Sequence, residues 1–174
     1  MGNESAIIVP VPEVESTVGS LRLQYDPAAQ LGIPAHITLL YPFGSPGAAC
    51  DAINMLKDLF ASVQAFPFSF AQVRRFPATV YLYPNRPEAF AQIIRTLMKT
   101  WPDRQPYGGA FSEIIPHLTV ADRVGPEVLS AVEESLRPQL PIQCVAREAW
   151  LLTSDEAGMW SKMAGFPLAA SETD

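Results

Sequence analysis

The stretch Pro34-Ala35-His36-Ile37-Thr38-Leu39-Leu40 decides the fold, because its core returns later in the chain as Pro116-His117-Leu118-Thr119-Val120. The two copies hold the only histidines of the sequence. In each copy a proline precedes the histidine closely and a threonine follows it two positions later. Side chains alternate between faces along a strand, so each copy predicts a strand with a His/Thr face and an apolar opposite face.

The predicted elements follow the same order around both copies. A helix precedes each histidine strand, and a helix, a strand, a turn and a further strand come after it. The histidines occupy positions 36 and 117, about half of the 174 residues apart. The predicted helices span 13–25, 48–64, 87–101 and 126–136, and the predicted strands span 6–11, 36–41, 66–75, 79–83, 116–121, 142–153 and 159–166. We therefore predict an α+β fold made of a duplicated unit, with residues 1–174 forming a single domain of two pseudo-symmetric lobes.

Composition and charge narrow the class of ligand. Hydrophobic residues make up 48% and charged residues 17% of the chain, which is typical of a globular protein that folds alone. The formal net charge is −6 and the pI is near 4.9, so the chain has no overall positive field to hold a long polyanion. We expect a small phosphorylated nucleotide or an RNA terminus as the ligand, and no duplex nucleic acid.

The cysteines and the N-terminus bear on where the protein works. Cys50 and Cys144 lie outside any CxxC or Cys/His cluster, and we expect both to be reduced and mostly buried. Residues 1–5 lack the basic region and apolar core of a signal peptide, and no apolar run approaches the roughly 18 to 20 residues of a membrane span. The sequence therefore predicts a cytoplasmic protein without a membrane segment, and we expect a monomer.

The residue types of the repeated motif fit phosphodiester chemistry. A histidine side chain, with an ordinary pKa near 6.5, can take up or release a proton close to neutral pH. If the two motifs face one groove, one histidine can act as the base for an attacking oxygen and the other as the acid for a leaving oxygen. The hydroxyls of Thr38 and Thr119 can donate to the nonbridging oxygens. Such a site requires no metal ion.

Other kinds of site fit the sequence less well. Two histidines without a cysteine cluster fall short of a zinc site, and a Ser-His-Asp triad would leave one histidine unexplained. Neither GxxxxGK[ST] nor GxGxxG occurs, and Gly108-Gly109 alone is a weak phosphate-loop signal. A lone histidine in an apolar strand is more often a structural residue. Two structural histidines are not expected to share the same neighbours in a repeat, so the duplication favours a functional site.

The motifs also carry a family resemblance. His36-Ile37-Thr38 and His117-Leu118-Thr119, in a duplicated α+β chain, resemble the paired motifs of the 2H phosphoesterase superfamily. The sequence from Ile33 to Phe43 is similar to that of its bacterial 2′-5′ RNA ligase-like branch, and Pro116 to Ala121 matches the second motif. The resemblance spans nearly the whole chain. It implies a bilobal fold in which two antiparallel sheets line a central groove, with helices outside.

The resemblance implies an RNA-processing hydrolase without a cofactor, acting on 2′,3′-cyclic or 2′-5′ phosphodiesters of nucleotides or RNA ends. By motif position, His36 and His117 would be the catalytic acid and base, in either order, and Thr38 and Thr119 would bind phosphate. The alternative, from a different class, is a noncatalytic nucleotide or RNA-end binding protein that uses the same groove. A purely structural role would require both histidines to be buried and apart.

Substrate contacts are the least determined part of the site. Phe43 and Tyr107 lie in predicted loops near the motifs and could stack on a base, while Arg75 or Arg123 could meet a phosphate. The alternative for each is core packing for the aromatic ring and solvation for the arginine. Residues 102–109 are predicted to form a lid or substrate loop. Two tryptophans within strand patterns are expected in the core: Trp150 and Trp160.

Overall fold

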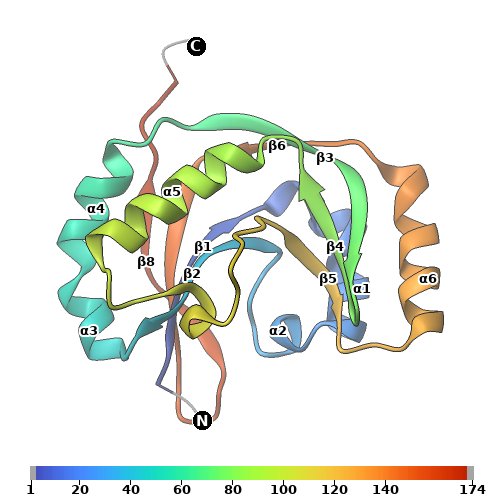
Figure 1. Cartoon of the computed structure of the whole chain (residues 1–174), viewed down its shortest axis with the longest axis horizontal. Helices are drawn as coiled ribbons and strands as arrows, with labels where there is room; N and C mark the ends of the chain where they lie inside the picture. Colours follow the sequence, from blue (N-terminus) through green and yellow to red (C-terminus); the bar gives the residue numbers. More distant parts are fainter. Residues whose placement is uncertain (1–2, 172–174) are drawn as a thin grey trace.

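A computed structural model describes residues 3–171 and contains two four-stranded antiparallel sheets (Figure 1). The strand orders are β2-β1-β7-β8 and β5-β4-β3-β6. The strands are β1 (Ser5–Pro10), β2 (His36–Gly44), β3 (Phe66–Phe76), β4 (Thr79–Pro84), β5 (Leu118–Asp122), β6 (Ile142–Ala146), β7 (Glu148–Ser154) and β8 (Trp160–Pro167). The helices are α1 (Glu15–Tyr25), α2 (Pro27–Gln30), α3 (Pro46–Asp51), α4 (Ile53–Ala61), α5 (Pro87–Thr100) and α6 (Pro126–Leu136), with 3-10 turns η1 (Pro12–Val14), η2 (Pro106–Gly109) and η3 (Arg137–Gln139). The predicted α+β fold is confirmed.

The duplicated unit is visible in the way strands and helices connect. In the first unit β1 leads through α1 to β2, which pairs back on β1, and in the second β4 leads through α5 to β5, which pairs back on β4. Helix α1 contacts β5, whereas α5 contacts β2, so each helix packs on the histidine strand of the other unit. The strands β2 and β5 are the edges of their sheets and contact one another. This exchange brings the two motifs together.

One predicted strand is wrong in its continuity. Residues 142–153 were expected to form one long strand, but they form β6 and β7, which belong to different sheets and are separated at the exposed Arg147. Strand β6 pairs with β3, opposite Phe68, and β7 pairs with β1. The alternation of apolar residues along 142–153 is compatible with a strand in either sheet. The pattern therefore cannot report where a chain leaves one sheet for the other.

The helix predicted over 48–64 is also interrupted. It begins at Pro46, where the Ser45 hydroxyl accepts a hydrogen bond from the Ala48 N–H, and it breaks at Ala52 into α3 and α4. The predicted helices over 87–101 and 126–136 are confirmed as α5 and α6, with ends that agree to within one residue. Helices α3 and α4 lie at one side of the molecule and α6 at the other (Figure 1).

The core lies on one face of each sheet and is covered by helices. Buried side chains of both sheets, among them Ile7, Ile37 and Leu118, form one continuous cluster. Helix α4 adds Phe60, whose ring stacks on Phe166 of β8 at 5.7 Å. The opposite faces of the sheets also carry buried side chains outside this cluster, which include Ile8, Leu152 and Tyr81. These opposite faces also carry the motif residues.

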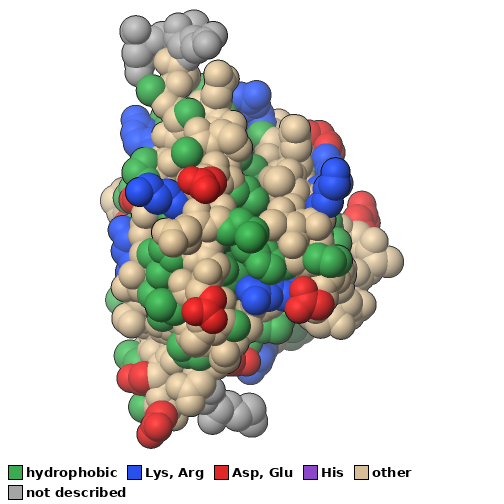
Figure 2. Space-filling model, turned by 90° about the vertical axis from the view of Figure 1, so that its left-hand side faces the viewer, with side chains coloured by type: hydrophobic (Ala, Val, Ile, Leu, Met, Phe, Trp, Pro, Cys, Tyr) green, Lys and Arg blue, Asp and Glu red, His purple; other side chains and the backbone are tan. Residues whose placement is uncertain are grey.

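Two further predictions concern the burial of the cysteines and the absence of a membrane-spanning segment. Both cysteines are free, and Cys144 is buried as predicted, but Cys50 is exposed because α3 turns its neighbour Ala49 inward. Among residues 3–171, no helix is long and apolar enough to cross a membrane. Figure 2 shows the face that carries α3 and α4, on which acidic and basic side chains are interspersed and no histidine is visible.

Candidate active site

The two motifs adopt the same local structure. His36 is the first residue of β2, and His117 directly precedes β5. In both motifs the histidine and the threonine are half-buried, while the residue between them, Ile37 or Leu118, is fully buried. The alternation predicted from the sequence is confirmed at both places. Each strand edge therefore presents an imidazole and a hydroxyl together.

Each histidine is held through the same ring nitrogen. His36 Nδ1 lies 2.7 Å from the Pro34 carbonyl oxygen, and His117 Nδ1 lies 2.6 Å from the Ile115 carbonyl oxygen. A carbonyl oxygen only accepts, so Nδ1 donates its proton in both cases. The neutral imidazole then has its free lone pair on Nε2, and the protonated imidazole has a second N–H there. In both rings Nε2 is therefore the nitrogen that is not engaged by the backbone.

A cavity of about 280 Å³ opens beside the first motif. His36 and Thr38 line it together with Ile8 of β1 and Tyr107 of η2. The remaining lining residues are Ala6, Asp26, Pro27, Ala28, Leu31, Ile33, Tyr41, Asp122, Arg123 and Trp160.

The second motif lies against a different set of side chains. The His117 ring packs edge-on against Phe76 and Tyr81, at 5.3 and 5.2 Å between ring centroids. His117 and Thr119 are not among the side chains that line the cavity. Thr119 lies on the adjoining edge strand β5, and His117 directly precedes that strand. The two motifs are neighbours because strands β2 and β5 contact one another.

The surroundings of both imidazoles lower their pKa values. Burial, followed by the positive charge of Arg22, lowers the pKa of His36 to about 4, and the neighbouring His117 acts in the same direction. Burial also lowers the pKa of His117, against the opposing effects of its bond to Ile115 and of the Asp122 carboxylate. A phosphate in the site would place negative charge beside both rings and so favour their protonated forms.

One buried arginine connects the segments that carry the motifs. Arg22 of α1 is 2% exposed and pairs with Asp26 at 2.8 Å. Its guanidinium also donates to the Thr119 carbonyl oxygen of the second motif and to the Ile33 carbonyl oxygen just before the first, at 3.2 Å each. Glu15, also on α1, accepts a hydrogen bond from the Ala35 N–H at 2.6 Å. Helix α1 therefore fixes both motif segments.

Three aromatic side chains gather at the cavity. Tyr41 contacts Tyr107 and Trp160 edge-on, with centroids 6.2 and 6.1 Å apart. Tyr107, predicted as a substrate contact, lies beside Thr38 in a turn with left-handed backbone angles. Trp160 was expected in the core, and this expectation is wrong because it is half-buried and lines the cavity.

The position of Tyr41 was missed because it depends on an irregular strand. Regular alternation from Thr38 would turn Tyr41 toward the core. In the pairing of β1 with β2, however, Ile8 opposes Thr38 while Ile7 opposes Leu40, so β2 has one extra residue. Such a bulge shifts the alternation by one residue and turns Tyr41 to the cavity side.

Phe43 is not at the site. Its side chain is fully buried and lies edge-on to Trp101 at 5.1 Å, with the Arg104 guanidinium 4.2 Å from its ring centroid. The prediction that it stacks on a base does not fit this position, because no face of the ring is open to a ligand. A second register shift lies between the pairs Ile7↔Leu40 and Ser5↔Gly44, so Phe43 does not continue the alternation that places Tyr41 at the cavity.

The two arginines considered for phosphate binding take different positions. Arg75 forms a two-point ion pair with Glu133 of α6, at 2.6 and 2.7 Å, and does not line the cavity. Arg123 does line the cavity, next to Asp122. Of the two, only Arg123 is placed to reach a ligand there.

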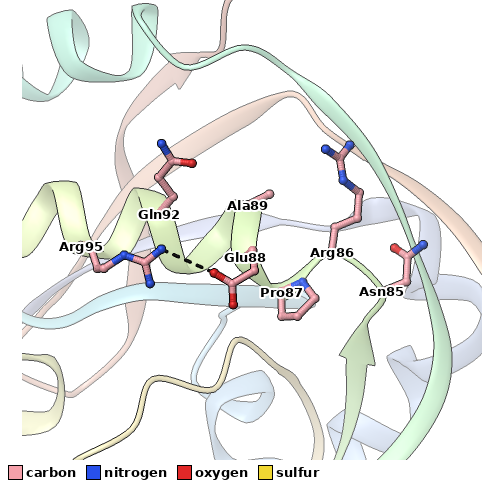
Figure 3. A pocket seen from close by; sticks show the side chains of 7 residues that line it. All are labelled: Asn85, Arg86, Pro87, Glu88, Ala89, Gln92 and Arg95. Atoms are coloured by element: carbon pink, nitrogen blue, oxygen red, sulfur yellow. Dashed lines mark ion pairs between the residues drawn. The ribbon is translucent and has the colours of Figure 1, made fainter.

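A second depression lies at the start of α5, away from the motifs (Figure 3). Its lining residues are Asn85, Arg86, Pro87, Glu88, Ala89, Gln92 and Arg95. Glu88 and Arg95 form an ion pair across it at 3.5 Å, and both side chains are exposed. Neither histidine contributes to it. In residues 3–171 no group of three or more histidine, cysteine and acidic side chains is arranged to hold a metal ion.

The lowered pKa values of the half-buried histidines should make the protein less stable in mild acid. Between pH 6.5 and about 4 the unfolded chain binds a proton at His36 and the native protein does not, so the free energy of unfolding falls as the pH falls. Above pH 6.5 both states are neutral at His36 and its contribution is constant. For one group the slope is at most about 1.4 kcal/mol per pH unit. Urea unfolding at about pH 5 and about pH 7 measures the difference.

A His36→Asn variant isolates this contribution. Its side-chain amide can still donate to the Pro34 carbonyl oxygen but does not titrate, so its stability should change less between the two pH values. Asp26 acts in the opposite sense in both proteins, because burial raises the pKa of its carboxyl. An equal pH dependence in wild type and variant would contradict the assignment to His36.

Comparisons with known proteins agree with this architecture. E. coli LigT without ligand superimposes with a TM-score of 0.65 and 15% identity, covering 97% of this chain and 98% of that chain. The protein TT0787 of Thermus thermophilus gives a TM-score of 0.67 and 17% identity, covering 97% and 100%. At such identities the likeness establishes the fold.

Among curated proteins no sequence matches the chain significantly. The family model of the 2'-5' RNA ligase superfamily matches residues 10–158, which include both motifs and most of the chain. The chain therefore belongs to the 2'-5' RNA ligase superfamily.

Proposed function

We propose that this protein is a metal-independent phosphodiesterase that acts on 2′,3′-cyclic or 2′-5′ phosphodiesters of nucleotides or RNA ends. The observation that supports this most is the matched geometry of His36 and His117. Both rings donate through Nδ1 to a backbone carbonyl, which leaves both Nε2 atoms for the substrate, and they lie on edge strands that contact one another.

The reaction on a 2′,3′-cyclic phosphate uses the two Nε2 atoms in opposite roles. A neutral imidazole takes a proton from water as the water oxygen forms a bond to phosphorus. The bond from phosphorus to one ribose oxygen breaks, and the other imidazole, protonated, gives its proton to that oxygen. Thr38 and Thr119 donate hydrogen bonds to the nonbridging oxygens as charge develops on them.

A nucleoside next to the phosphate would meet the aromatic side chains of the cavity. Tyr107 is 40% exposed and lies beside Thr38, so a base could stack on its ring. LigT structures contain 3'-AMP, ATP or NADP+, which are small phosphorylated nucleotides of this class. We also infer a single domain, since one apolar core is shared by both sheets. A monomer that works in the cytoplasm stays a prediction from the sequence.

The test is hydrolysis of 2′,3′-cyclic nucleotides and 2′-5′ dinucleotides by the wild-type protein in the presence of a chelator. We expect turnover that persists in the chelator, with a 3′,5′-cyclic nucleotide as the control that is not cleaved. Loss of all activity in the chelator would contradict the metal-independent mechanism. Tight binding of a nonhydrolysable cyclic phosphate without any turnover of the substrates, seen by calorimetry, would favour the noncatalytic binding protein.

A further inference from the structure

The groove-facing side of the first sheet continues well beyond its catalytic motif. Thr38 is paired with Ile8, Ile8 with Trp150 of β7, and Trp150 with Gly165 of β8. Directly paired residues of an antiparallel sheet point to the same face. Thr38, Ile8 and Trp150 therefore form a row across the sheet. With strands about 4.8 Å apart, the backbone of Trp150 is about 10 Å from that of Thr38.

A lysine lies across this tryptophan. Lys162 of β8 has its Nζ atom 4.1 Å from the Trp150 ring centroid, and the lysine side chain is 42% exposed. The position of Lys162 depends on Gly165, because a Cβ atom there would lie 2.9 Å from both Cε and Nζ of the lysine. A side chain at this position would therefore displace the flexible end of the lysine from its place over the ring.

The polar groups of this surface are incompletely satisfied within the protein. Glu148 is the carboxylate near Lys162, at 3.9 Å, which is the outer limit of an ion pair. Trp150 Nε1 is buried and has no hydrogen-bond partner. An unpaired buried N–H is costly, and a weakly held ammonium is easily drawn to a stronger acceptor.

A nucleotide could supply a closer anionic partner for the Lys162 ammonium and a hydrogen-bond acceptor for Trp150 Nε1. A phosphate would attract the Lys162 ammonium from the ring, since a charge-assisted hydrogen bond outweighs a cation–π contact at an exposed site. Movement of the lysine would uncover the Trp150 ring for a base and open a path to Nε1. The two changes support each other, so phosphate and base would bind together.

We propose that Lys162 and Trp150 form a subsite for the nucleotide next to the one that carries the reacting phosphodiester, so that the groove takes oligonucleotide ends of at least two nucleotides. This inference rests on the proposed function, because the row begins at Thr38. It assigns Lys162 to the neighbouring phosphate and the Trp150 ring to the neighbouring base, with Gly165 as the residue that makes their arrangement possible.

The experiment compares two substrates of different length. They are a 2′,3′-cyclic mononucleotide and a trinucleotide that ends in the same 2′,3′-cyclic nucleotide. We expect the wild-type protein to have the higher kcat/KM on the trinucleotide. Lys162→Ala and Trp150→Leu should each lower kcat/KM for the trinucleotide about tenfold more than for the mononucleotide, mainly through KM, because base–aromatic stacking and a phosphate contact are of this size. Gly165→Ala should do the same more weakly.

Lys57→Ala is the matched control. It removes the same charge from an exposed position on α4, the helix that packs against the other face of β8, and should leave the ratio of the two kcat/KM values unchanged. A wild-type protein that cleaves both substrates without preferring the trinucleotide would overturn the subsite and leave the proposed function intact. Equal losses on both substrates in Lys162→Ala would also overturn it.

A binding measurement covers the case in which neither substrate is cleaved, which would contradict the proposed function. Calorimetry with a trinucleotide 3′-phosphate and a mononucleotide 3′-phosphate should then show tighter binding of the trinucleotide to the wild type, and Lys162→Ala should remove that advantage. Equal affinities of the wild type for the two ligands would end the proposal.

Discussion

Replacing His36 or His117 with alanine should lower kcat for 2′,3′-cyclic nucleotide hydrolysis by about 100- to 10,000-fold. Positioned general acid or base catalysis contributes rate factors of this size. Both rings are anchored through Nδ1 and are free at Nε2, so alanine removes a proton carrier without disturbing the buried residues on either side. Steady-state kinetics of the two single variants and the double variant measure the effect.

The asparagine variants separate chemistry from anchoring. His36→Asn and His117→Asn keep an N–H for the carbonyl oxygens of Pro34 and Ile115 but have nothing at the position of Nε2. They should fold like the wild type and be as inactive as the alanine variants. Substantial activity in either one would mean that the corresponding imidazole only anchors its strand.

The pH dependence of kcat/KM gives an independent measure of the same groups. The profile should be bell-shaped, because one imidazole must be neutral and the other protonated in the free enzyme. Both pKa values are lowered, His36 to about 4, so the maximum should lie below pH 6.5. The profile of kcat should be displaced to higher pH, since bound phosphate favours the protonated rings. A kcat/KM maximum clearly above pH 7 would contradict the lowered pKa values of both histidines.

The sequence was sufficient for the parts of the site that repeat. Both motifs alternate between half-buried polar and fully buried apolar residues, as the pattern of His36 to Leu39 and of His117 to Val120 predicts. The duplicated order of elements gave the α+β class. These features depend on local periodicity, which a single sequence contains.

The parts that were missed depend on contacts between distant segments. Two register shifts between β1 and β2 separate Tyr41, which faces the cavity, from the buried Phe43, and no local pattern reports them. The strand ends at Arg147 because β6 pairs with β3 and β7 pairs with β1, which belong to different sheets. The residues next to Arg147 in the sequence do not reveal this change of sheet. Trp160 reaches the cavity because its backbone N–H donates to the Leu31 carbonyl oxygen at 2.9 Å. This bond connects the start of β8 to the end of α2.

Arg22 is the clearest case, because the sequence did contain a signal. It follows the buried Val18 by four positions and precedes Asp26 by four, so the three share one helix face. An arginine on the buried face of a helix, four residues before an aspartate, is compatible with a buried ion pair. Its use at the site could not be inferred, because the carbonyl oxygen of Thr119 is 97 residues away.

Arg22→Met should lower the free energy of unfolding by about 3 to 5 kcal/mol, since it leaves the Asp26 carboxylate buried and unpaired. It also leaves the carbonyl oxygens of Thr119 and Ile33 without their donor. Urea unfolding measures the loss. Arg95→Met is the matched control, because Arg95 forms an exposed ion pair with Glu88 that should contribute about 0 to 1 kcal/mol.

A double variant shows whether Arg22 also positions the catalytic groups. Arg22→Met with Asp26→Asn removes the unpaired charge, while the amide oxygen can still accept from the Ala28 N–H, so much of the lost stability should return. Activity should not return with it, since nothing then connects the Thr119 and Ile33 carbonyls. Arg22 lowers the pKa of His36 by its charge, so its removal should raise that pKa and move the acid limb of kcat/KM to higher pH. A stable double variant with wild-type kcat/KM and an unshifted acid limb would show that Arg22 serves the fold alone.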